Sequence, residues 1–463
     1  MGQAISMAAV YCCCTAGNSL CQSCFGTAAV GTTGRKRSVL LLAGVIATSL
    51  WFQYSVGPSI ATRSHWIWKT PTFGQWVYEA WHDPCVAANP DATMDVLEEC
   101  AGNAGVYRPT ALSTLFFAAN AVATNIVPTL NREAWPAKYS LFGISLLVSL
   151  VISSDPLFSS FYLWVARLGA GIFVVLQQVI LIDVAYNWND DWVEKANESD
   201  RLSFGSGSGW LHAIVGVCLA LYTTCLVTIG FLYRDYTGVE GCSGNTWVIT
   251  LTLLGIVGVT ALQLLGTAEG SLLTSGVISL YAVYLAFSIV SKNPSGDCNP
   301  RLGTNDVWGI TIGLLLTTVS LVWTGWSWSA EPRLVNSESL QSARAVTPSA
   351  RTELPPELDL DVPLVDGEEE ATSGTVTTQR ESSSLGHLWK LNVVLALVSC
   401  YVAMILTGWG TLHTQMDEET HNAANPTVGK VNMAILGVSQ WLALGLYAWT
   451  LVAPQLFPDR DFS

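Results

Sequence analysis

Ten long runs of mostly apolar residues constrain the fold of this chain more than any other feature. Only 12% of its 463 residues are charged, about half the share usual in soluble domains, and the charges collect between the runs. An apolar run of about 20 residues has the length of a helix that spans a bilayer. The sequence therefore predicts an all-α, polytopic membrane protein of about ten transmembrane helices, at about 38–61, 109–127, 138–153, 158–186, 209–232, 246–266, 271–290, 306–328, 388–411 and 431–453.

The polar stretches divide the chain into four parts. A cysteine-rich segment, 1–37, precedes a membrane domain with the first eight spans, 38–330, and the last two spans with a short tail occupy 387–463. Between them lies 331–386, where 11 acidic residues against 4 arginines supply half of the net charge of −14. This acidic loop has too little apolar content to bury a core and is expected to be disordered, either as a solvated linker or as a trafficking or phosphorylation loop. No basic stripe suits nucleic acid, which is not expected as a partner.

The first basic cluster sets the expected orientation. Arg35, Lys36 and Arg37 stand immediately before the first apolar run, which is too long for a cleaved signal and reads as a signal-anchor. Lys and Arg beside a span favour the cytoplasmic side. Ten spans then place both termini and the acidic loop in the cytoplasm of an integral, multi-pass protein of the endomembranes or the plasma membrane.

Four cysteines are consistent with this orientation. Each falls in a loop on the outer, oxidising side, where disulfides form and persist; they are Cys85, Cys100, Cys242 and Cys298. Four cysteines permit three pairings, and the sequence does not choose among them.

The N-terminus carries a possible lipidation signal. Met1-Gly2-Gln3-Ala4-Ile5-Ser6 fits the pattern for myristoylation of Gly2. Palmitoylation of nearby cysteines would add the second anchor that stable attachment needs; the candidates are Cys12, Cys13 and Cys14. The alternatives are zinc bound with Cys21-x-x-Cys24, which is weak without a second spaced pair, and cysteines that simply pack at the membrane.

The fourth apolar run predicts an unusually long helix. No proline occurs from Ser159 to about Asn197, and about 40 helical residues would extend about 60 Å, twice the hydrocarbon thickness. Such a helix must tilt or project from the membrane. It carries Arg167 and Asp183, about 160° apart around the axis, with Gln178 within about 20° of Arg167. Charges inside a span are disfavoured and point to function, so Arg167, Gln177, Gln178 and Asp183 are candidates for a polar lipid path. Asp183 could alternatively lie at the boundary in water.

Catalytic and metal-binding patterns are missing. The sequence has no His-Glu-x-x-His motif and no phosphate-binding loop, and two loose pairs, His82 with Cys85 and His413 with His421, fall far short of a metal site. No enzyme activity, metal or cofactor is expected.

Several short stretches, in order along nearly the whole chain, resemble the serine incorporator (Serinc) family. They are Cys12-Cys13-Cys14 with Cys21-x-x-Cys24, Val106-Tyr107-Arg108, Gln177-Gln178-Val179-Ile180-Leu181-Ile182-Asp183, Trp188-Asn189, Cys298-Asn299-Pro300, Leu406-Thr407-Gly408-Trp409, Tyr447-Ala448-Trp449 and Asp459-Arg460-Asp461-Phe462. The resemblance implies ten helices in two bundles crossed by a long diagonal helix, and a possible homo-oligomer.

The resemblance also implies a role in lipid handling. The family is linked to phosphatidylserine and sphingolipid metabolism and to energy-independent scrambling of phospholipids, so these membrane lipids are the expected partners. One alternative is a non-catalytic carrier or scaffold that supplies serine to lipid-synthesis enzymes. Another is a structural membrane-organising protein.

Overall fold

The computed structural model describes residues 33–88, 90, 93–127, 130, 134–202, 207–238, 241–265, 271–302, 307–323, 388–411 and 426–456. Helices dominate this part of the chain: α2 (Thr33–Trp51), η1 (Phe52–Val56), α3 (Gly57–Ala61), η2 (Trp66–Lys69), α4 (Phe73–Ala88), α5 (Met94–Ile126), α6 (Trp135–Ser149), η4 (Leu157–Tyr162), α7 (Leu163–Leu202), α8 (Ser208–Tyr236), α9 (Ser243–Leu265), α10 (Leu272–Val290), α13 (Leu388–Leu406) and α14 (Pro426–Leu456). A further apolar helix covers Val307–Trp323. The lipidation candidates Gly2, Cys12, Cys13 and Cys14 and the 331–386 loop lie outside the described residues.

The described residues of each of the ten apolar runs lie mainly on helices. Within the described ranges, seven helices are long and apolar enough to cross a membrane by length and composition, and the Val307–Trp323 helix is a shorter apolar one. The second and third runs correspond to α5 and α6. The chain is therefore an all-α, multi-pass membrane protein.

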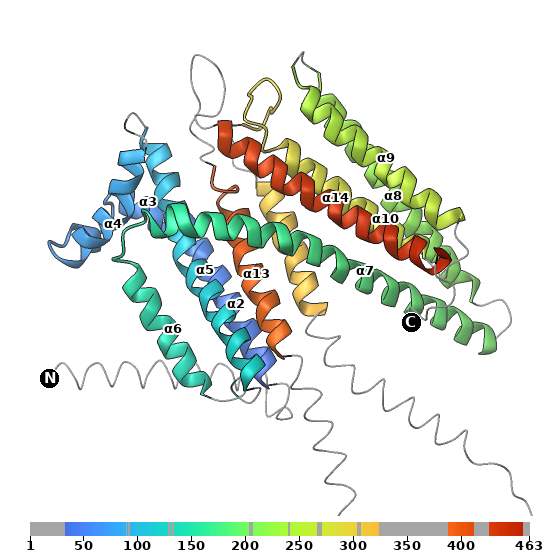
Figure 1. Cartoon of the computed structure of the whole chain (residues 1–463), viewed down its shortest axis with the longest axis horizontal. Coiled ribbons are helices and arrows are strands. Elements are labelled where there is room, and N and C mark those ends of the chain that lie inside the picture. The colour runs from blue at the N-terminus through green and yellow to red at the C-terminus, as the bar shows by residue number, and fades with distance from the viewer. Residues whose placement is uncertain are drawn as a thin grey trace, which may run out of the picture.

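Two helix bundles lie on either side of α7 (Figure 1). The first bundle contains α2, α5, α6 and α13, in which α13 packs on α5 and α2. The second contains α8, α9, α10 and α14, with α10 packing against the other three. The α7 helix is 40 residues long, as the proline-free sequence predicts, and it contacts α13 on one side and α8, α10 and α14 on the other. It thus runs diagonally across both bundles (Figure 1).

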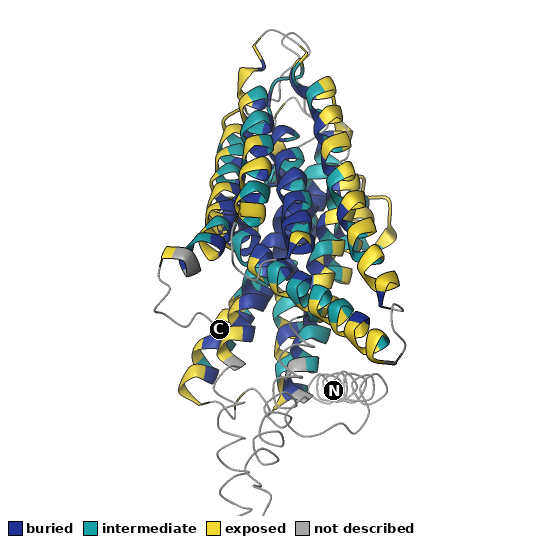
Figure 2. Cartoon of the chain, turned by 90° about the vertical axis from the view of Figure 1, so that its right-hand side faces the viewer, coloured by how far each residue is buried: buried dark blue, intermediate teal, exposed yellow. Residues whose placement is uncertain are grey.

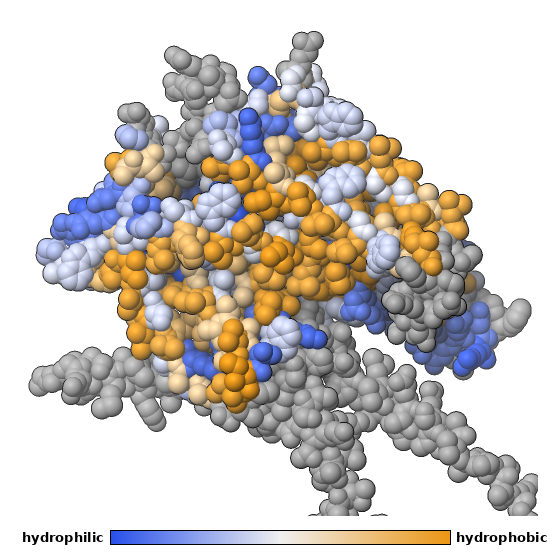
Figure 3. All heavy atoms as spheres, in the orientation of Figure 1, coloured by the Kyte–Doolittle hydropathy of each residue, from blue (hydrophilic) through white to orange (hydrophobic). Residues whose placement is uncertain are grey.

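Burial differs sharply among the apolar helices. In α10 and in α13 72% of the most apolar window is buried, against 17% in α8. Figure 2 shows the buried residues at the centre and the exposed ones on the outer helices. Leucines such as Leu219 and Leu254 are exposed, and Figure 3 shows a broad apolar surface on the face in view. Because lipid tails are as apolar as leucine, such side chains are compatible with lipid contact.

A buried arginine fixes the end of the first bundle. The side chain of Arg108 donates hydrogen bonds to the carbonyl oxygens of Ala104, Ser149, Ile152 and Ala80 at 2.6, 2.9, 2.8 and 3.3 Å. Its guanidinium also lies 4.3 Å from the ring centroid of Trp81. One side chain thereby joins α4 and α5 to the end of α6.

Candidate functional site

The contact between α7 and the two bundles, here called the seam, begins at two glycines. A Cβ on Gly169 would lie 2.7 Å from the Sγ of Cys400 in α13, and a Cβ on Gly171 would lie 3.0 Å from Cγ2 of Ile435 in α14. Small residues let helices approach closely in membranes. Two glycines separated by a single residue on α7 therefore bring it against α13 and α14 at nearly the same level.

Arg167 lies buried in the seam, 4% exposed. Its Nη2 donates to the carbonyl oxygen of Trp409 at 3.3 Å, and the Nδ2 of Asn432 in α14 donates to the same oxygen at 2.9 Å. In the described part of the chain no carboxylate forms an ion pair with Arg167, and its Nε has no hydrogen-bond partner there. The guanidinium is therefore held by neutral groups.

The carbonyl that receives Arg167 belongs to an unusual turn. Gly408, Trp409 and Gly410 follow α13 and have φ values of 56°, 67° and 73°. A positive φ suits glycine but is disfavoured for tryptophan, so packing must hold Trp409 in place. Its side chain is 3% exposed. This turn links α13 to α7 and α14 through a single backbone oxygen.

The two glutamines face protein as well. Gln177, 0% exposed, accepts a 3.2 Å hydrogen bond at Oε1 from the hydroxyl of Tyr281 in α10, which also donates to the carbonyl of Val174. Gln178 donates through Nε2 to the carbonyl of Ala443 in α14 at 2.9 Å. Gln178 thus bonds to α14, and Arg167 bonds to a carbonyl oxygen that Asn432 of α14 also contacts, in keeping with the small angle between them.

Asp183 differs from the other three candidates because it is exposed. Its Oδ2 accepts a 2.6 Å hydrogen bond from the indole of Trp323, at the end of the Val307–Trp323 helix. Its Oδ1 accepts one from Asn187 at 3.1 Å. The structure therefore places three candidates inside the seam and one at its margin.

The first part of α7 presents an apolar surface beside the seam. Trp164, Leu168, Ile172 and Val179 are at least half exposed, as expected of a face towards acyl chains. With the seam packed as observed, the neighbouring helices therefore separate Arg167, Gln177 and Gln178 from lipid.

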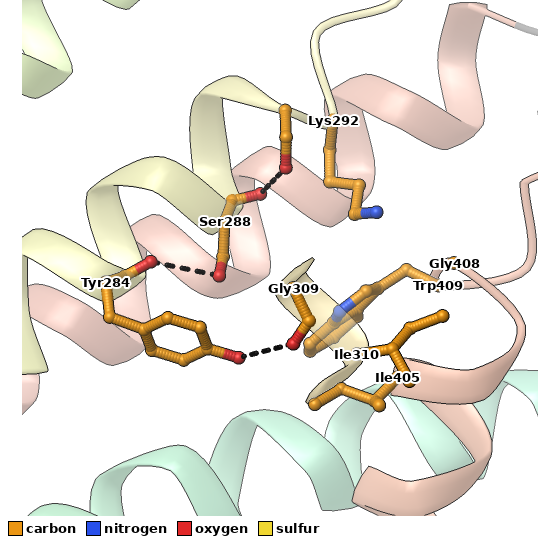
Figure 4. Close-up of a pocket in the computed structure, with 9 residues that line it drawn as sticks. Tyr284, Ser288, Lys292, Gly309, Ile310, Ile405, Gly408 and Trp409 are labelled. Carbon is orange, nitrogen blue, oxygen red and sulfur yellow. Dashed lines mark hydrogen bonds between the residues drawn. The ribbon is translucent and has the colours of Figure 1, made fainter. Parts of the chain in front are cut away.

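A small cavity lies beside the same turn, where three segments meet (Figure 4). It has a volume of about 30 Å³ and is lined by α10 with the residues after it, the start of the Val307–Trp323 helix, and the end of α13; the polar members are Tyr284, Ser288, Ser291, Lys292 and the backbone of Gly309. The Trp409 side chain forms part of its wall, so this residue joins the cavity to Arg167.

Both disulfides lie at one end of the molecule, here called the disulfide end. Cys85 of α4 pairs with Cys100 of α5, and Cys242 before α9 pairs with Cys298 after α10. All four candidate cysteines are thus paired, in one of the three combinations that the sequence left open. The Gly408–Gly410 turn and the cavity lie towards the same end, because α13 and α10 both run towards it (Figure 1).

The sequence did not single out three residues that the structure places in important contacts: Arg108 at the end of the first bundle, Lys292 in the cavity lining and Trp409 at the seam. Arg108 and Lys292 stand at the edges of apolar runs, where charged residues usually reach water. The available signal for Trp409 was its position between two glycines after a run. Among the described residues no group of three or more His, Cys, Asp or Glu could hold a metal.

Comparisons with known proteins agree with the resemblance found in the motifs. The family model described as Serine incorporator (Serinc) matches residues 10–460. Serine incorporator 3 of Bos taurus is 27% identical over 390 residues, covering 77% of this chain and 80% of the relative. Serine incorporator 2 of Bos taurus is 29% identical, covering 71% of each chain, and a probable serine incorporator of Nematostella vectensis is 27% identical, covering 71% and 72%. With a family model matched over nearly its whole length, this chain belongs to the serine incorporator family.

Proposed function

We propose that this protein moves phospholipids between the two leaflets without an energy source, along the seam, and without catalysing a covalent reaction. The observation that carries the proposal is a set of four polar side chains spaced along α7, on more than one of its faces: Arg167, Gln177, Gln178 and Asp183. From Arg167 to Asp183 the set extends about 24 Å, most of the about 30 Å hydrocarbon thickness. A polar group without a partner in hydrocarbon is disfavoured by several kcal/mol, and these side chains would supply partners to a crossing headgroup.

Transfer requires the seam to open, because Arg167, Gln177 and Gln178 are turned towards protein. Arg167 and Gln178 are each held by one hydrogen bond to a main-chain carbonyl. The net contribution of such a bond is about 0.5–1.5 kcal/mol, or about 1.5–3 for a charged donor. Water or a headgroup can replace these neutral acceptors, so separation of α7 from α14 and from the turn after α13 does not require a buried ion pair of Arg167 or Gln178 to break. Asp183, already exposed, would receive the headgroup at the other end.

The basic test is lipid exchange by the purified protein in liposomes, with a fluorescent reporter in both leaflets and a quencher added outside. We expect the inner-leaflet signal to be lost rapidly without nucleotide or ion gradient. Exchange no faster than in protein-free liposomes would refute the proposed function.

A disulfide across the seam tests the route. A Cβ on Gly171 would lie 3.2 Å from the Oγ of Ser439, close to the about 3 Å that separates Cβ from the opposite sulfur in a disulfide. The double variant Gly171→Cys, Ser439→Cys, once oxidised, should exchange lipid at least about tenfold more slowly, since the lock adds more than the about 1.4 kcal/mol that corresponds to a factor of ten. Reduction should restore exchange.

Each single variant and the unaltered protein, with and without reductant, are the controls, because the native disulfides also respond to reductant. Normal exchange by a fully cross-linked protein would place the route elsewhere.

The membrane orientation is a further part of the proposal. Two disulfides at one end favour placing that end in the oxidising compartment, with both termini and the 331–386 loop in the cytoplasm. An epitope inserted in that loop should be inaccessible to antibody in intact cells and accessible after permeabilisation. Accessibility in intact cells would reverse the orientation.

A further inference from the structure

The α10 helix begins at a buried N-terminus that lacks the usual side-chain cap. Ser271 holds the N-cap position, and the first hydrogen bond of the helix is donated by the amide of Ser275 to the carbonyl of Ser271 at 3.2 Å. The amides of Leu272, Leu273 and Thr274 therefore have no acceptor within the helix. A serine at the N-cap normally accepts from one of these amides, but the Ser271 side chain makes no such bond. The N-terminus thus presents amide donors that its own N-cap residue leaves unsatisfied.

Two hydroxyl groups at this N-terminus are buried and have no hydrogen-bond partner within the part of the chain that the structure describes. They belong to Ser271, 7% exposed, and to Thr274, 0% exposed and third in the helix. Elsewhere, buried hydroxyls such as those of Ser279 and Thr317 donate to the carbonyl four residues earlier, at 2.7 and 2.8 Å. Ser271 and Thr274 stand too near the start of α10 to have such a carbonyl within the helix. A buried hydroxyl without a partner is disfavoured, so these two groups point to a ligand.

The groups gathered here favour an anion. Amide donors and the positive end of the helix dipole make a helix N-terminus a natural site for phosphate, and the hydroxyls of Ser271 and Thr274 add two further donors. The neighbouring hydroxyl of Ser275 is already paired with that of Tyr447 at 2.9 Å. All of these donors are neutral, so they suit the phosphate that phospholipids share rather than one particular headgroup amine.

The start of α10 lies at the level of lipid, at the end opposite to the disulfides. Because a disulfide joins the residues before α9 to those after α10, the end of α9 and the start of α10 lie together at the other end (Figure 1). Three leucines there, Leu264, Leu265 and Leu272, are 68%, 83% and 38% exposed. Such side chains are compatible with acyl chains, so a phospholipid can place its tails beside them and its phosphate at the N-terminus.

This N-terminus is also continuous with the seam. Thr274 precedes Tyr281 by seven residues, which places it about 10 Å along the helix and within about 20° on the same face. The Tyr281 hydroxyl donates to Oε1 of Gln177 on α7, and Nε2 of Gln177 is another buried atom without a partner. The hydroxyl oxygens of Ser271 and Thr274 are covered in the packed structure, so a headgroup reaches them when the seam opens, as it reaches Gln177.

We propose that the N-terminus of α10, with the hydroxyls of Ser271 and Thr274, binds the phosphate of a phospholipid and so receives the headgroup at the end of the seam opposite to the disulfides. This inference rests on the proposed function, because it names the place where a headgroup enters or leaves the seam. The site recognises the phosphate and does not distinguish choline, ethanolamine and serine lipids.

Binding of a lipid with and without phosphate tests the site. The purified full-length protein in detergent is titrated with short-chain phosphatidylcholine and with the diacylglycerol of the same chains. In Ser271→Ala, Thr274→Val we expect the affinity for phosphatidylcholine to fall about tenfold, the effect of losing a charge-assisted hydrogen bond, and the affinity for diacylglycerol to stay unchanged. The matched control Ser279→Ala, Thr317→Val removes hydroxyls bonded within their own helices and should change neither affinity. An unchanged affinity for phosphatidylcholine in the first variant would overturn the site.

Two further titrations identify the anion. Inorganic phosphate should compete with phosphatidylcholine, because both present phosphate oxygens; inorganic phosphate that binds without displacing the lipid would overturn the assignment to a lipid. Glu269, two residues before Ser271 in the sequence, offers a competing carboxylate. Binding of phosphatidylcholine by Glu269→Gln but not by the unaltered protein would show that this carboxylate takes the place of the phosphate, and would overturn the site.

Thermal stability gives a readout that needs no lipid. Removing buried hydroxyls that have no partner should raise the melting temperature of Ser271→Ala, Thr274→Val in phosphate-free detergent solution. The control variant loses satisfied hydrogen bonds and should melt at a lower temperature than the unaltered protein. A lower melting temperature of Ser271→Ala, Thr274→Val would mean that its hydroxyls are already paired, against the proposal.

The liposome assay on the same variants separates this inference from the proposed function. Lipid exchange by a protein that shows no phosphate-dependent binding refutes the site and leaves the function standing. Phosphate-dependent binding that Ser271→Ala, Thr274→Val abolishes, in a protein that exchanges no lipid, supports the site and refutes the function.

Discussion

Replacing Arg167 with leucine tests whether a buried charge on α7 favours opening of the seam. In the packed seam this guanidinium is 4% exposed and has one hydrogen bond, to the Trp409 carbonyl at 3.3 Å, with the ring of Trp164 5.5 Å away. Placing an arginine at the centre of a transmembrane helix is disfavoured by about 2.5–3.5 kcal/mol. A single hydrogen bond from a charged donor stabilises by about 1.5–3 kcal/mol and so offsets most of this unfavourable free energy.

The difference indicates that the packed seam is destabilised by about 1 kcal/mol relative to an open seam in which Arg167 reaches water or headgroups. Leucine removes this destabilisation of the packed seam, and it also removes the cation that would attract a headgroup phosphate in the open seam. We therefore expect Arg167→Leu to slow exchange by roughly tenfold, which corresponds to about 1.4 kcal/mol. Asp183→Asn, at an exposed position that retains a hydrogen-bond acceptor for Trp323, should change the rate by less than about twofold.

Two measurements test whether the charge of Arg167 favours opening of the seam: the exchange rate in liposomes and the yield of monodisperse protein. Arg167→Lys keeps a charge and should retain most of the exchange. Arg167→Gln keeps a donor for the Trp409 carbonyl without the charge, and serves if the leucine variant does not fold. A folded, uncharged variant that exchanges lipid at the original rate would refute the reasoning, because the charge would then contribute nothing to opening.

Three further predictions concern the scaffold. In the double variant Cys242→Ser, Cys298→Ser, a disulfide no longer closes a loop of 56 residues, so the melting temperature should fall, with at most about 4 kcal/mol of the free energy of unfolding lost. Mass mapping of the unaltered protein without reductant should find the Cys242–Cys298 pair, and free thiols at these positions would contradict it. Deleting 340–384 should leave a monodisperse, inserted protein, whereas its loss would show that the acidic loop packs on the helices. Arg108→Lys should markedly reduce folded yield, since three N–H donors replace five and leave buried carbonyls unsatisfied; normal yield would show that the hydrogen bonds of Arg108 are dispensable.

Much of the architecture follows from the sequence. Apolar runs located the helices, because a bilayer fixes how many apolar residues a span needs. The absence of proline from Ser159 to Asn197 predicted one helix, and α7 covers most of that stretch and extends to Leu202. Ordered short motifs indicated the family that the comparisons establish. The expected orientation placed four cysteines in outward-facing loops and so marked them for disulfide bonding, and all four are paired.

The tertiary structure decided where the polar side chains point and what they meet. Periodicity placed Arg167 and Asp183 on different faces of α7, but only packing shows that one is buried and the other exposed. The Trp409 carbonyl joins Arg167 to Asn432, and Lys292 lines a cavity together with the end of α13, more than 100 residues further along the chain. In a membrane, apolar side chains face lipid and protein alike, so hydropathy does not reveal which face of a helix is buried. That choice depends on close contacts, such as those at Gly169 and Gly171, between helices distant in the chain.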